Sequence, residues 1–296
     1  MALPALRPGD RVAVLSPASF PPPPALDAGI AVLRDWGLQV VEAEHLRGGP
    51  LPPIGAAASD ADRAADFQAA WADPDIAAIW CARGGYGVTR LLEHLDQDAL
   101  ATGRPKPVIG FSDATPLLHR LARDYAAPAI HGPVLTSLGD GDPRTLAATR
   151  ALLFGELGCG EALLNDLDPW QRGASATGPL VGGNIALLAG SLGCGDLIPG
   201  RDALIFLEDL GQPSWVLDRA LVQLRRSGWF DGAAAVVLGD IDATELPEAL
   251  PGMLRDFFAT LGLPVWAAGS FGHGTTNLPL PIGVRAVLDG STLRLA

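Results

Sequence analysis

The sequence has little positive charge and almost no lysine. Its 296 residues include 21 Lys and Arg against 33 Asp and Glu, a formal net charge of −12. Lys106 is the only lysine, and no Gly-x-x-x-x-Gly-Lys run can be drawn around it, which excludes a P-loop. An acidic chain lacks the basic face that nucleic-acid phosphates require, so we expect no nucleic-acid partner.

Apolar runs, cysteine motifs and metal-binding motifs are also scarce. No run approaches the length of a membrane-spanning helix, and the first ten residues lack the basic and apolar regions of a signal peptide. We therefore expect a cytoplasmic protein without a membrane partner. Cys81, Cys159 and Cys194 are scattered, and neither Cys-x-x-Cys nor His-Glu-x-x-His occurs. The sequence thus predicts no disulfide framework, no metal and no cofactor.

The sequence does contain an alternation of short apolar runs with helical periodicity, typical of an α/β fold. At 48% hydrophobic and 18% charged residues, the chain can bury a substantial core. Short apolar strands separated by helices predict a parallel sheet covered on both faces. The predicted N-terminal strands are Arg11–Leu15, Leu38–Val41, Ile76–Cys81, Pro107–Gly110 and Pro128–His131. Helices are expected from Leu26 to Trp36 and, after an N-cap at Ser59 with Asp62 three residues on, through Trp71.

The weak periodicity of residues 155–178 predicts a linker between two domains. The N-terminal α/β domain would comprise residues 1–154 and the C-terminal domain residues 179–296. Helices are expected at Asn184–Leu192, Pro213–Ser227 and Pro247–Leu261, and strands at Ala203–Leu207, Ala234–Gly239, Pro264–Ala267 and from Val284 to Leu295.

The first chemical signal is a buried strand that runs into Gly110-Phe111-Ser112, after which a helical pattern resumes at Pro116. This is the strand–turn–helix context of a nucleophile elbow, in which a tight turn lifts a serine hydroxyl above the sheet edge. Ala114 replaces the usual second glycine, so the motif is incomplete. The alternative interpretation is that Ser112 only caps the following helix.

A glycine-rich loop, residues 83–87 (Arg-Gly-Gly-Tyr-Gly), follows the strand that ends at Cys81. Backbone N–H groups of such a loop can approach a ligand closely, supplying part of an oxyanion hole or holding a carboxylate. A plain glycine turn is the alternative. The spacing does not match Gly-x-Gly-x-x-Gly, so dinucleotide binding has little support.

A serine nucleophile needs a base and a third group that orients the base. Of the five histidines, His273 lies in a glycine-flanked loop and is slightly favoured over His131, which ends a predicted strand. Glu208 and Asp209 end another apolar strand. Adjacent strand residues face opposite ways, so at most one of them faces the site, and spacing alone does not choose between them.

Several stretches, taken together, resemble the LD-carboxypeptidase family of serine peptidases, and the resemblance extends over nearly the whole chain. They are residues 14–19 (Val-Leu-Ser-Pro-Ala-Ser), 83–87, 89–92 (Thr-Arg-Leu-Leu), 110–113 (Gly-Phe-Ser-Asp), 131–133 (His-Gly-Pro), 180–184 (Leu-Val-Gly-Gly-Asn), 206–209 (Phe-Leu-Glu-Asp), 218–219 (Asp-Arg), 223–225 (Gln-Leu-Arg) and 271–274 (Phe-Gly-His-Gly) ahead of Asn277.

The resemblance implies a fold and a site. The fold is a flavodoxin-like parallel-sheet N-terminal domain with a smaller C-terminal α/β domain, and the active site lies at their interface. Ser112 would be the nucleophile, His273 the general base and Glu208 the residue that orients it. The oxyanion hole would use backbone amides, here those of Asp113 and of Gly84 or Gly85.

The resemblance also implies a reaction, release of the terminal D-alanine from a murein tetrapeptide in cell-wall recycling. Arg83, Arg225 and Asn184 are candidate contacts for the substrate carboxylate, since arginine suits a bidentate clamp. A same-fold hydrolase of a peptide-linked, microcin-type antibiotic is the second hypothesis, and a non-catalytic sugar-peptide binding module is the third. A homodimer is an expectation from the family. Because a muropeptide is anionic, the charge of −12 opposes its approach, and local donors must bind it.

Overall fold

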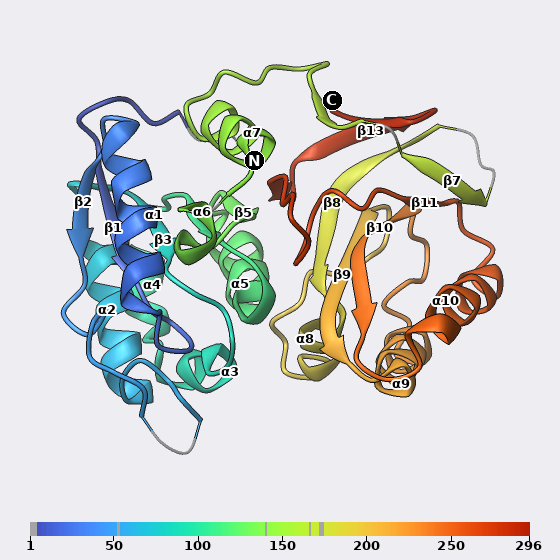
Figure 1. The fold of residues 1–296 in the computed structure, drawn as a ribbon, viewed down its shortest axis with the longest axis horizontal. Helices are drawn as coiled ribbons and strands as arrows, with labels where there is room; N and C mark the ends of the chain where they lie inside the picture. The colour runs from blue at the N-terminus through green and yellow to red at the C-terminus, as the bar shows by residue number, and fades with distance from the viewer. Residues whose placement is uncertain (1–4, 52–53, 140, 166, 172–174) are drawn as a thin grey trace.

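The computed structural model describes residues 5–51, 54–139, 141–165, 167–171 and 175–296. Two sheets lie side by side, with α5 (Thr115–Tyr125) between them (Figure 1). The first sheet has the strand order β12-β5-β4-β3-β1-β2, and the second has the order β6-β14-β13-β8-β9-β10-β11-β7. The chain is therefore an α/β protein, as predicted.

The first sheet is built from five parallel strands and one antiparallel strand. The parallel strands are β1 (Arg11–Leu15), β2 (Gln39–Glu42), β3 (Ile76–Cys81), β4 (Val108–Gly110) and β5 (Ala129–His131). Every strand that the sequence predicts in this half is present, within one or two residues at its ends. Helices α1 (Pro23–Asp35), α2 (Asp60–Ala72), α3 (Val88–Leu91), α4 (Gln97–Thr102), α6 (Leu135–Leu138) and α7 (Pro143–Leu153) complete this half.

Helix α2 shows how local sequence sets an element boundary. Ser59 has extended backbone angles, and its hydroxyl oxygen accepts a hydrogen bond from the N–H of Asp62 at 3.1 Å. This satisfies one of the N–H groups that a helix leaves free in its first turn. The predicted N-cap at Ser59 is confirmed.

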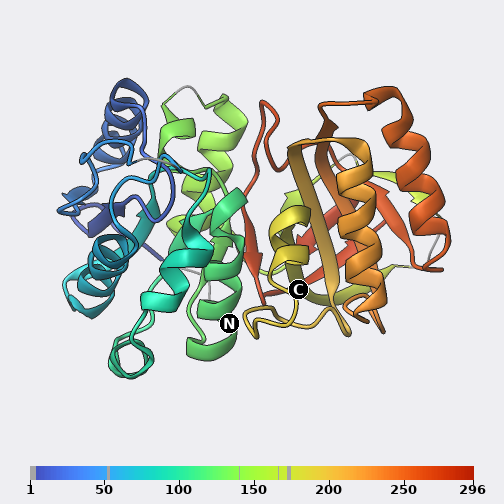
Figure 2. The ribbon, with the colours of Figure 1, turned by 90° about the horizontal axis from the view of Figure 1, so that it is seen from below.

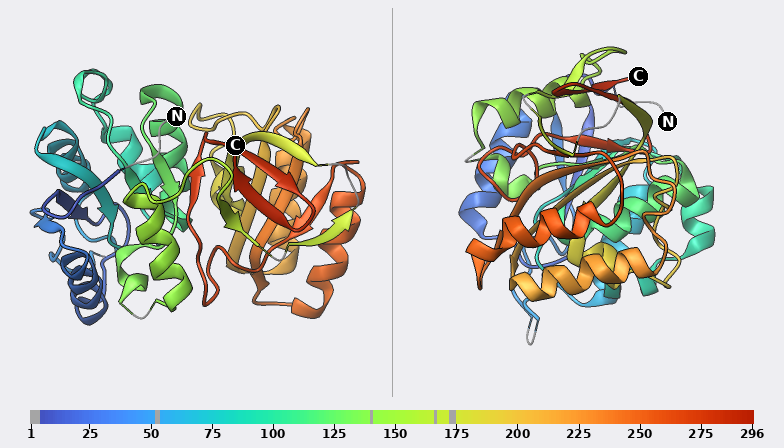
Figure 3. Two further views of the ribbon diagram at one scale, coloured as in Figure 1. Left: turned by 90° about the horizontal axis from the view of Figure 1, so that it is seen from above. Right: turned by 90° about the vertical axis from the view of Figure 1, so that its right-hand side faces the viewer.

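The second sheet has a parallel centre and antiparallel flanks. The central strands are β8 (Ala176–Asn184), β9 (Leu204–Gln212), β10 (Ala235–Ala243) and β11 (Val265–Ala267). Helices α8 (Ile185–Gly190), α9 (Ser214–Arg226) and α10 (Leu250–Ala259) follow β8, β9 and β10. Figure 2 shows α9 and α10 along one face of this sheet, and the C-terminus lies on its other side (Figure 3).

Two expectations about the domain boundary need correction. Residues 155–178 are not simply a linker, because they include β6 (Ala162–Leu164) and β7 (Asp168–Gln171), the two edge strands of the second sheet; residues 166 and 172–174 lie outside the described ones. β6 is only three residues long, and β7 exposes Asp168 and Pro169. Their sequence therefore has the weak periodicity of a loop.

The second correction concerns β12 (Leu280–Ile282), which pairs antiparallel with β5 at the edge of the first sheet. The chain thus returns to the N-terminal half before β13 (Arg285–Asp289) and β14 (Thr292–Leu295) complete the second sheet. The sequence did not predict β12, since Pro281 at its centre argues against an internal strand. Proline is tolerated there because β12 is an edge strand.

A buried histidine joins the two halves. His119 on α5 is fully buried; its Nε2 donates to the carbonyl of Gly182 at 2.8 Å, and its Nδ1 accepts from the N–H of Ile198 at 3.1 Å. Burial lowers the pKa of His119 to about 4, so it is neutral at pH 7. Phe206 and Val237 of the second sheet share one hydrophobic core with the first sheet, so the halves are packed together.

Among the described residues, no helix combines the length and apolar character needed to span a bilayer.

Candidate active site

Ser112 lies at a strained turn between β4 and α5. Its φ of +58° is unusual for a residue with a side chain, and such strain concentrates at functional turns. Gly110 permits the turn, because a Cβ there would lie 3.0 Å from both Cys81 Sγ and Ala114 Cβ. Thr115 Oγ1 donates to the Ser112 carbonyl at 2.8 Å. The side chain of Ser112 does not cap the helix, since no side-chain cap is found there.

His273 contacts both Ser112 and Glu208. Its Nε2 lies 3.1 Å from Ser112 Oγ, and its Nδ1 lies 2.6 Å from Glu208 Oε2. Glu208 is an acceptor when ionised, so the short contact places the proton on Nδ1 and leaves Nε2 free to accept from the serine hydroxyl. This hydrogen-bonded line joins the end of β4, the end of the buried part of β9 and the loop after β11.

The alternation of β9 decides which acid faces His273. Leu204 and Phe206 face the core shared with the first sheet, whereas Ile205 and Leu207 face α8 and α9. Glu208 continues the first set and points at the histidine.

Asp209 continues the second set, and its Oδ2 accepts from the N–H of Ala186 at 2.8 Å in the first turn of α8. Burial raises the pKa of Asp209 to about 6, although the Ala186 N–H acts against this. The two adjacent acids therefore have different surroundings and different hydrogen-bond partners.

The surroundings of His273 raise its pKa above 6.5. Burial lowers the pKa, but the hydrogen bond that His273 donates to Glu208 and the charge of Glu208 outweigh burial, and Asp209 and Asp240 add smaller contributions. The sequence analysis missed Asp240, whose only signal is an acid beside a glycine at the end of an apolar strand. Its Oδ2 accepts from the N–H of Gly274 at 3.0 Å.

Glycines on both sides of His273 allow the loop to approach the acids. Gly272 has φ +110°, and a Cβ there would lie 2.8 Å from Glu208 Cβ. A Cβ at Gly274 would collide with Asp240 Oδ2. Asn277 Oδ1 accepts from the N–H of Gly272 at 3.0 Å, and the N–H of Asn277 donates to Thr145 Oγ1 at 2.9 Å. The loop that carries His273 is thus held from three sides.

His131 lies in an aromatic environment instead. Its ring is fully buried and lies 5.8, 5.2 and 6.3 Å, between centroids, from Phe111, Phe206 and Phe271. Neither ring nitrogen has a hydrogen-bond partner among the residues that the structure describes. Burial lowers the pKa of His131 to about 3, with a smaller contribution from His273. Its surroundings are those of a neutral core residue.

The glycine-rich loop packs directly against the serine. A Cβ on Gly84 would lie 3.1 Å from Ser112 Cβ and 3.3 Å from Ser112 Oγ. Gly85 has φ +104°, and its Cβ would collide with Ser19 Oγ. Within the described part of the chain, the N–H groups of Gly84 and Gly85 have no hydrogen-bond partner. The loop therefore brings free backbone donors to the side of Ser112.

The three predicted substrate contacts lie in different places. Arg83 is the exposed first residue of the glycine-rich loop, and its Nη1 donates to the carbonyl of Phe20 at 2.8 Å. Asn184 is 3% exposed and is the N-cap of α8, accepting from the N–H of Leu187 at 3.2 Å. Its side chain also hydrogen-bonds to Asp209. Asn184 is thus buried against Asp209 and does not face an open site.

The structure does not bring Arg225 to Ser112. Arg225 lies in the last turn of α9, where it donates to Thr260 Oγ1 at 2.8 Å and stacks over Phe257 with its guanidinium carbon 5.2 Å from the ring centroid. A helix that follows a parallel strand runs back toward the amino ends of the strands, opposite to the edge that carries Glu208. The expectation that Arg225 binds substrate is therefore corrected.

A small cavity of about 100 Å³ opens beside His273. It is lined by Phe111, Pro133, Ser137, Gly141, Thr145, Gly272, His273, Gly274, Thr275 and Asn277. In the described residues no group of three or more His, Cys, Asp or Glu side chains could hold a metal ion.

Comparisons with known proteins identify both halves of the chain. Residues 12–132 match the profile described as the LD-carboxypeptidase N-terminal domain, and residues 177–288 match the LD-carboxypeptidase C-terminal domain. A murein tetrapeptide carboxypeptidase of Pseudomonas aeruginosa is 34% identical over 295 residues, which cover 96% of this chain and 94% of that protein.

Solved structures have the same fold. The muramoyltetrapeptide carboxypeptidase from Oxalobacter formigenes is similar with a TM-score of 0.80 at 27% identity, over 96% of this chain and 97% of that one. MccF in complex with glutamyl sulfamoyl guanosine is similar with a TM-score of 0.85 at 21% identity, over 99% and 98% of the two chains. The second likeness concerns the fold alone.

Proposed function

The chain belongs to the LD-carboxypeptidase family, and from that premise we propose that it is a serine carboxypeptidase acting on murein tetrapeptides. It would hydrolyse the L,D-amide bond that holds the terminal D-alanine. The observation that carries this proposal is the hydrogen-bonded line from Ser112 Oγ through His273 to Glu208. A serine, a histidine and a buried carboxylate in this order are the parts needed for acyl transfer.

In the proposed mechanism, His273 Nε2 takes the proton of Ser112 as Oγ attacks the scissile carbonyl. Glu208 holds the ring in the tautomer with the proton on Nδ1 and stabilises the imidazolium that forms. His273 then gives its proton to the leaving amine of D-alanine, and the peptide remains on Ser112 as an ester. His273 next takes a proton from water, which attacks the ester; as the bond to Ser112 Oγ breaks, His273 returns that proton to Oγ, and the shortened peptide is released.

The tetrahedral intermediates carry a negative oxygen that needs donors. The N–H groups of Gly84 and Gly85, which lack partners among the described residues, and the N–H of Asp113 are the proposed oxyanion hole. Loss of one such donor typically costs about 10²–10³ in rate. A glycine is needed at position 84, because a side chain there would press on Ser112.

The size of the cavity beside His273 favours a small leaving group. Because the leaving amine takes its proton from His273, the leaving residue must lie next to that ring. A space of about 100 Å³ beside the ring has room for a leaving group as small as alanine. Hydrolysis of a microcin-type conjugate, suggested by the fold shared with MccF, is the second candidate function.

Binding of the anionic peptide must overcome a net charge of −12. Arg83, the exposed first residue of the glycine-rich loop, is the proposed carboxylate contact, whereas Arg225 is omitted because it lies near the end of α9 against Thr260. Asn184 is proposed to act through Asp209 rather than on the substrate. A cytoplasmic location and a homodimer remain predictions.

The test is to incubate the enzyme with a murein tetrapeptide and to measure free D-alanine by mass spectrometry. We expect release by the wild type and none by Ser112→Ala. If the tetrapeptide stays intact while an aminoacyl sulfamoyl nucleoside is cleaved, the second candidate function is correct instead. Labelling of the wild type but not of Ser112→Ala by a fluorophosphonate would also contradict a purely binding module.

A further inference from the structure

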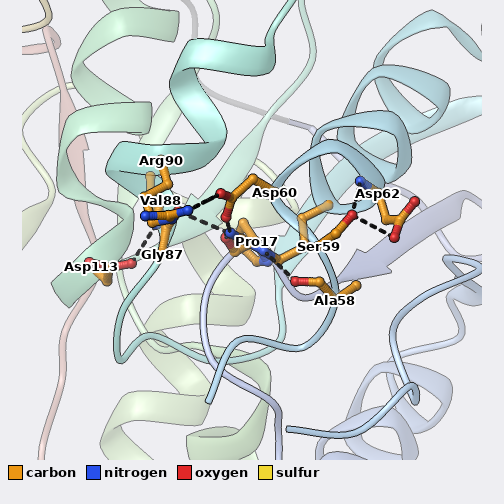
Figure 4. Close-up of polar contacts among 10 residues, drawn as sticks. Pro17, Ala58, Ser59, Asp60, Asp62, Gly87, Val88, Arg90 and Asp113 are labelled. Carbon is orange, nitrogen blue, oxygen red and sulfur yellow. Dashed lines mark hydrogen bonds and ion pairs between the residues drawn. The ribbon is translucent and has the colours of Figure 1, made fainter. Parts of the chain in front are cut away.

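A buried arginine lies behind the glycine-rich loop. Arg63, in the first turn of α2, is 1% exposed, and its guanidinium donates to backbone carbonyls of three separate segments. Nε donates to Ala58 O at 3.2 Å, and Nη1 donates to Gly87 O at 2.9 Å and also to Pro17 O. Nη2 pairs with Asp60. Figure 4 shows Pro17, Ala58, Asp60 and Gly87 gathered around this point.

The contact to Gly87 is one half of a two-sided grip on a single peptide unit. The carbonyl of Gly87 accepts from Arg63, and the N–H of the same peptide, on Val88, donates to Asp113 Oδ2 at 2.8 Å. Asp113 lies beside this peptide on the side away from Pro17 and Ala58 (Figure 4). The rotation of the peptide plane is thus set at both of its polar atoms.

The backbone at Gly87 is shaped for this grip. Its φ of +133° is open to glycine and strained for other residues, and a Cβ there would lie 2.9 Å from Arg63 Nη1. A glycine at position 87 therefore makes room for the Arg63 guanidinium as well as allowing the turn.

Arg63 also holds the segment that supports the other end of the loop. Pro17 accepts from Arg63, and two residues later the N–H of Ser19 donates to Gly84 O at 3.2 Å. Ser19 Oγ in turn accepts from the N–H of Tyr86 at 3.1 Å. Both ends of the loop from Gly84 to Gly87 are thus connected to one guanidinium.

We propose that Arg63 is a positioning residue for the oxyanion hole, acting through the Gly87–Val88 peptide and the Pro17–Ser19 segment. It sets the N–H groups of Gly84 and Gly85 against the N–H of Asp113, on the opposite side of the developing oxyanion. This proposal rests on the proposed function, because it needs a tetrahedral intermediate on Ser112.

Lysine cannot replace Arg63 in this role. The contacts use three nitrogens of a planar fork at fixed angles, whereas an ammonium is a single point with no such plane. The charge matters as well: burial raises the pKa of Asp113 to about 6, and the positive charge of Arg63 acts against this shift. Arg63→Lys therefore keeps the charge and removes the geometry.

The chain offers a matched control, because α2 has a buried cation at each end. Lys106 is 4% exposed, and its Nζ donates to Ala70 O at 2.9 Å and Asp73 O at 2.6 Å, at the C-terminal end of α2. Lys106 precedes β4 and so lies at the sheet edge opposite to Ser112. Lys106→Met should lower the unfolding temperature and leave kcat within about threefold, typical of a structural site away from the chemistry.

The experiment measures kcat and KM for D-alanine release by Arg63→Lys, with the unfolding temperature of each variant. We expect kcat to fall about 10- to 100-fold with KM changed less than threefold, because a displaced donor is lost mainly in the transition state. Unchanged kcat, or a raised KM alone, would overturn the proposal. So would an equal fall of kcat in Lys106→Met, since both losses would then reflect stability.

Asp113→Ala tests the same peptide from its other side if Arg63→Lys does not fold. It frees the Val88 N–H, and we expect a loss of kcat of the same size; a kcat equal to wild type would refute the grip. Ser112→Ala, measured in parallel, separates the two levels of inference. If Ser112→Ala retains activity, the proposed function fails; if it is inactive and Arg63→Lys is unaffected, only the role of Arg63 fails.

Discussion

Two histidines lie close to the ring of Phe111, and their pKa values are shifted in opposite directions. The ring of Phe111 is 4.7 Å from that of His273 and 5.8 Å from that of His131, between centroids. Acids around His273 raise its pKa above 6.5, whereas burial lowers the pKa of His131 to about 3. The two residues were close alternatives for the base in the sequence.

The difference comes from what each ring faces. Parallel strands run toward a common edge of the sheet, and Glu208 of β9 and Asp240 of β10 both hold the loop that carries His273. His131 is fully buried among phenylalanine rings, which offer no hydrogen-bond acceptor. A histidine becomes a base when a carboxylate fixes its tautomer and supports its charged form. Four predictions test this contrast.

The largest effect is expected for His273→Ala. Without the base, kcat should fall by about 10⁴-fold or more, as for other triad members. The fold should persist, because the loop is also held through Gly272 and Asn277. D-alanine release and a far-UV circular dichroism spectrum are the measurements. Near-normal turnover would transfer the role of base to another group and remove the contrast.

Glu208→Gln should have the next largest effect. The amide can donate to Nδ1 and so favours the wrong tautomer, which is expected to lower kcat by about 10²–10⁴. Asp209→Asn is the control, since Asp209 accepts from Ala186 on the opposite face of β9. The control should mainly lower the unfolding temperature. Equal losses of kcat in both variants would contradict the assignment of the two faces.

The pH dependence should follow the raised pKa of His273. The base must be neutral, so kcat/KM should fall as the pH drops through a value above 6.5, not below it. Asp240→Asn keeps an acceptor for the Gly274 N–H and removes one negative charge that raises the pKa of His273, so the acid limb should move to lower pH. A pH profile from 5 to 9 for both proteins is the measurement. A shift of the acid limb to higher pH in Asp240→Asn would contradict the prediction that the charge of Asp240 raises the pKa of His273.

The smallest effect on activity is expected for His131→Leu, which should leave kcat within about threefold because the ring is away from the reacting atoms. Its nitrogens lack partners among the described residues, and an unpaired buried polar group costs about 1–3 kcal/mol, so the apolar variant should be as stable or more stable at pH 7.

The same variant should change acid stability. The folded pKa of His131 is about 3 against 6.5 for the free group, so the unfolded chain takes up a proton first as the pH falls. The contribution of the buried, neutral His131 ring to the unfolding free energy is therefore complete above pH 6.5, and it is lost progressively as the pH falls below that value. His131→Leu should flatten the fall of the unfolding free energy between pH 6.5 and about 4, measured by urea titration. A steeper fall of the unfolding free energy in the variant would show that the His131 ring is not neutral in the folded protein.

Local pattern predicted the elements that are regular and well buried. The five parallel strands of the first sheet, the cap at Ser59 and the turn at Ser112 follow from apolar runs, a serine before an acidic turn, and a glycine–serine pair after a strand. Strands at sheet edges were missed: β6 and β7 were interpreted as a linker, and β12 contains a proline. Their stability comes from a neighbouring strand, which the local sequence does not contain.

The sequence by itself determined the fold class, the family and a set of chemically suitable residues. Its motifs brought Ser112, His273 and Glu208 into consideration through a resemblance, and the alternation rule stated that only one of Glu208 and Asp209 could face the site. The resemblance already implied Glu208, and the tertiary structure turns Glu208 rather than Asp209 toward His273, because each face of β9 is defined by what packs on it.

Tertiary structure likewise decided that Arg225 lies at the far end of α9 and that Arg63, a plain surface-type residue in the sequence, lies buried behind the glycine-rich loop. The physical reason is that every residue has a backbone carbonyl, so the sequence does not show which carbonyls will accept a hydrogen bond from an arginine. Pro17, Ala58 and Gly87 accept from Arg63 only because folding brings their three loops to one sheet edge.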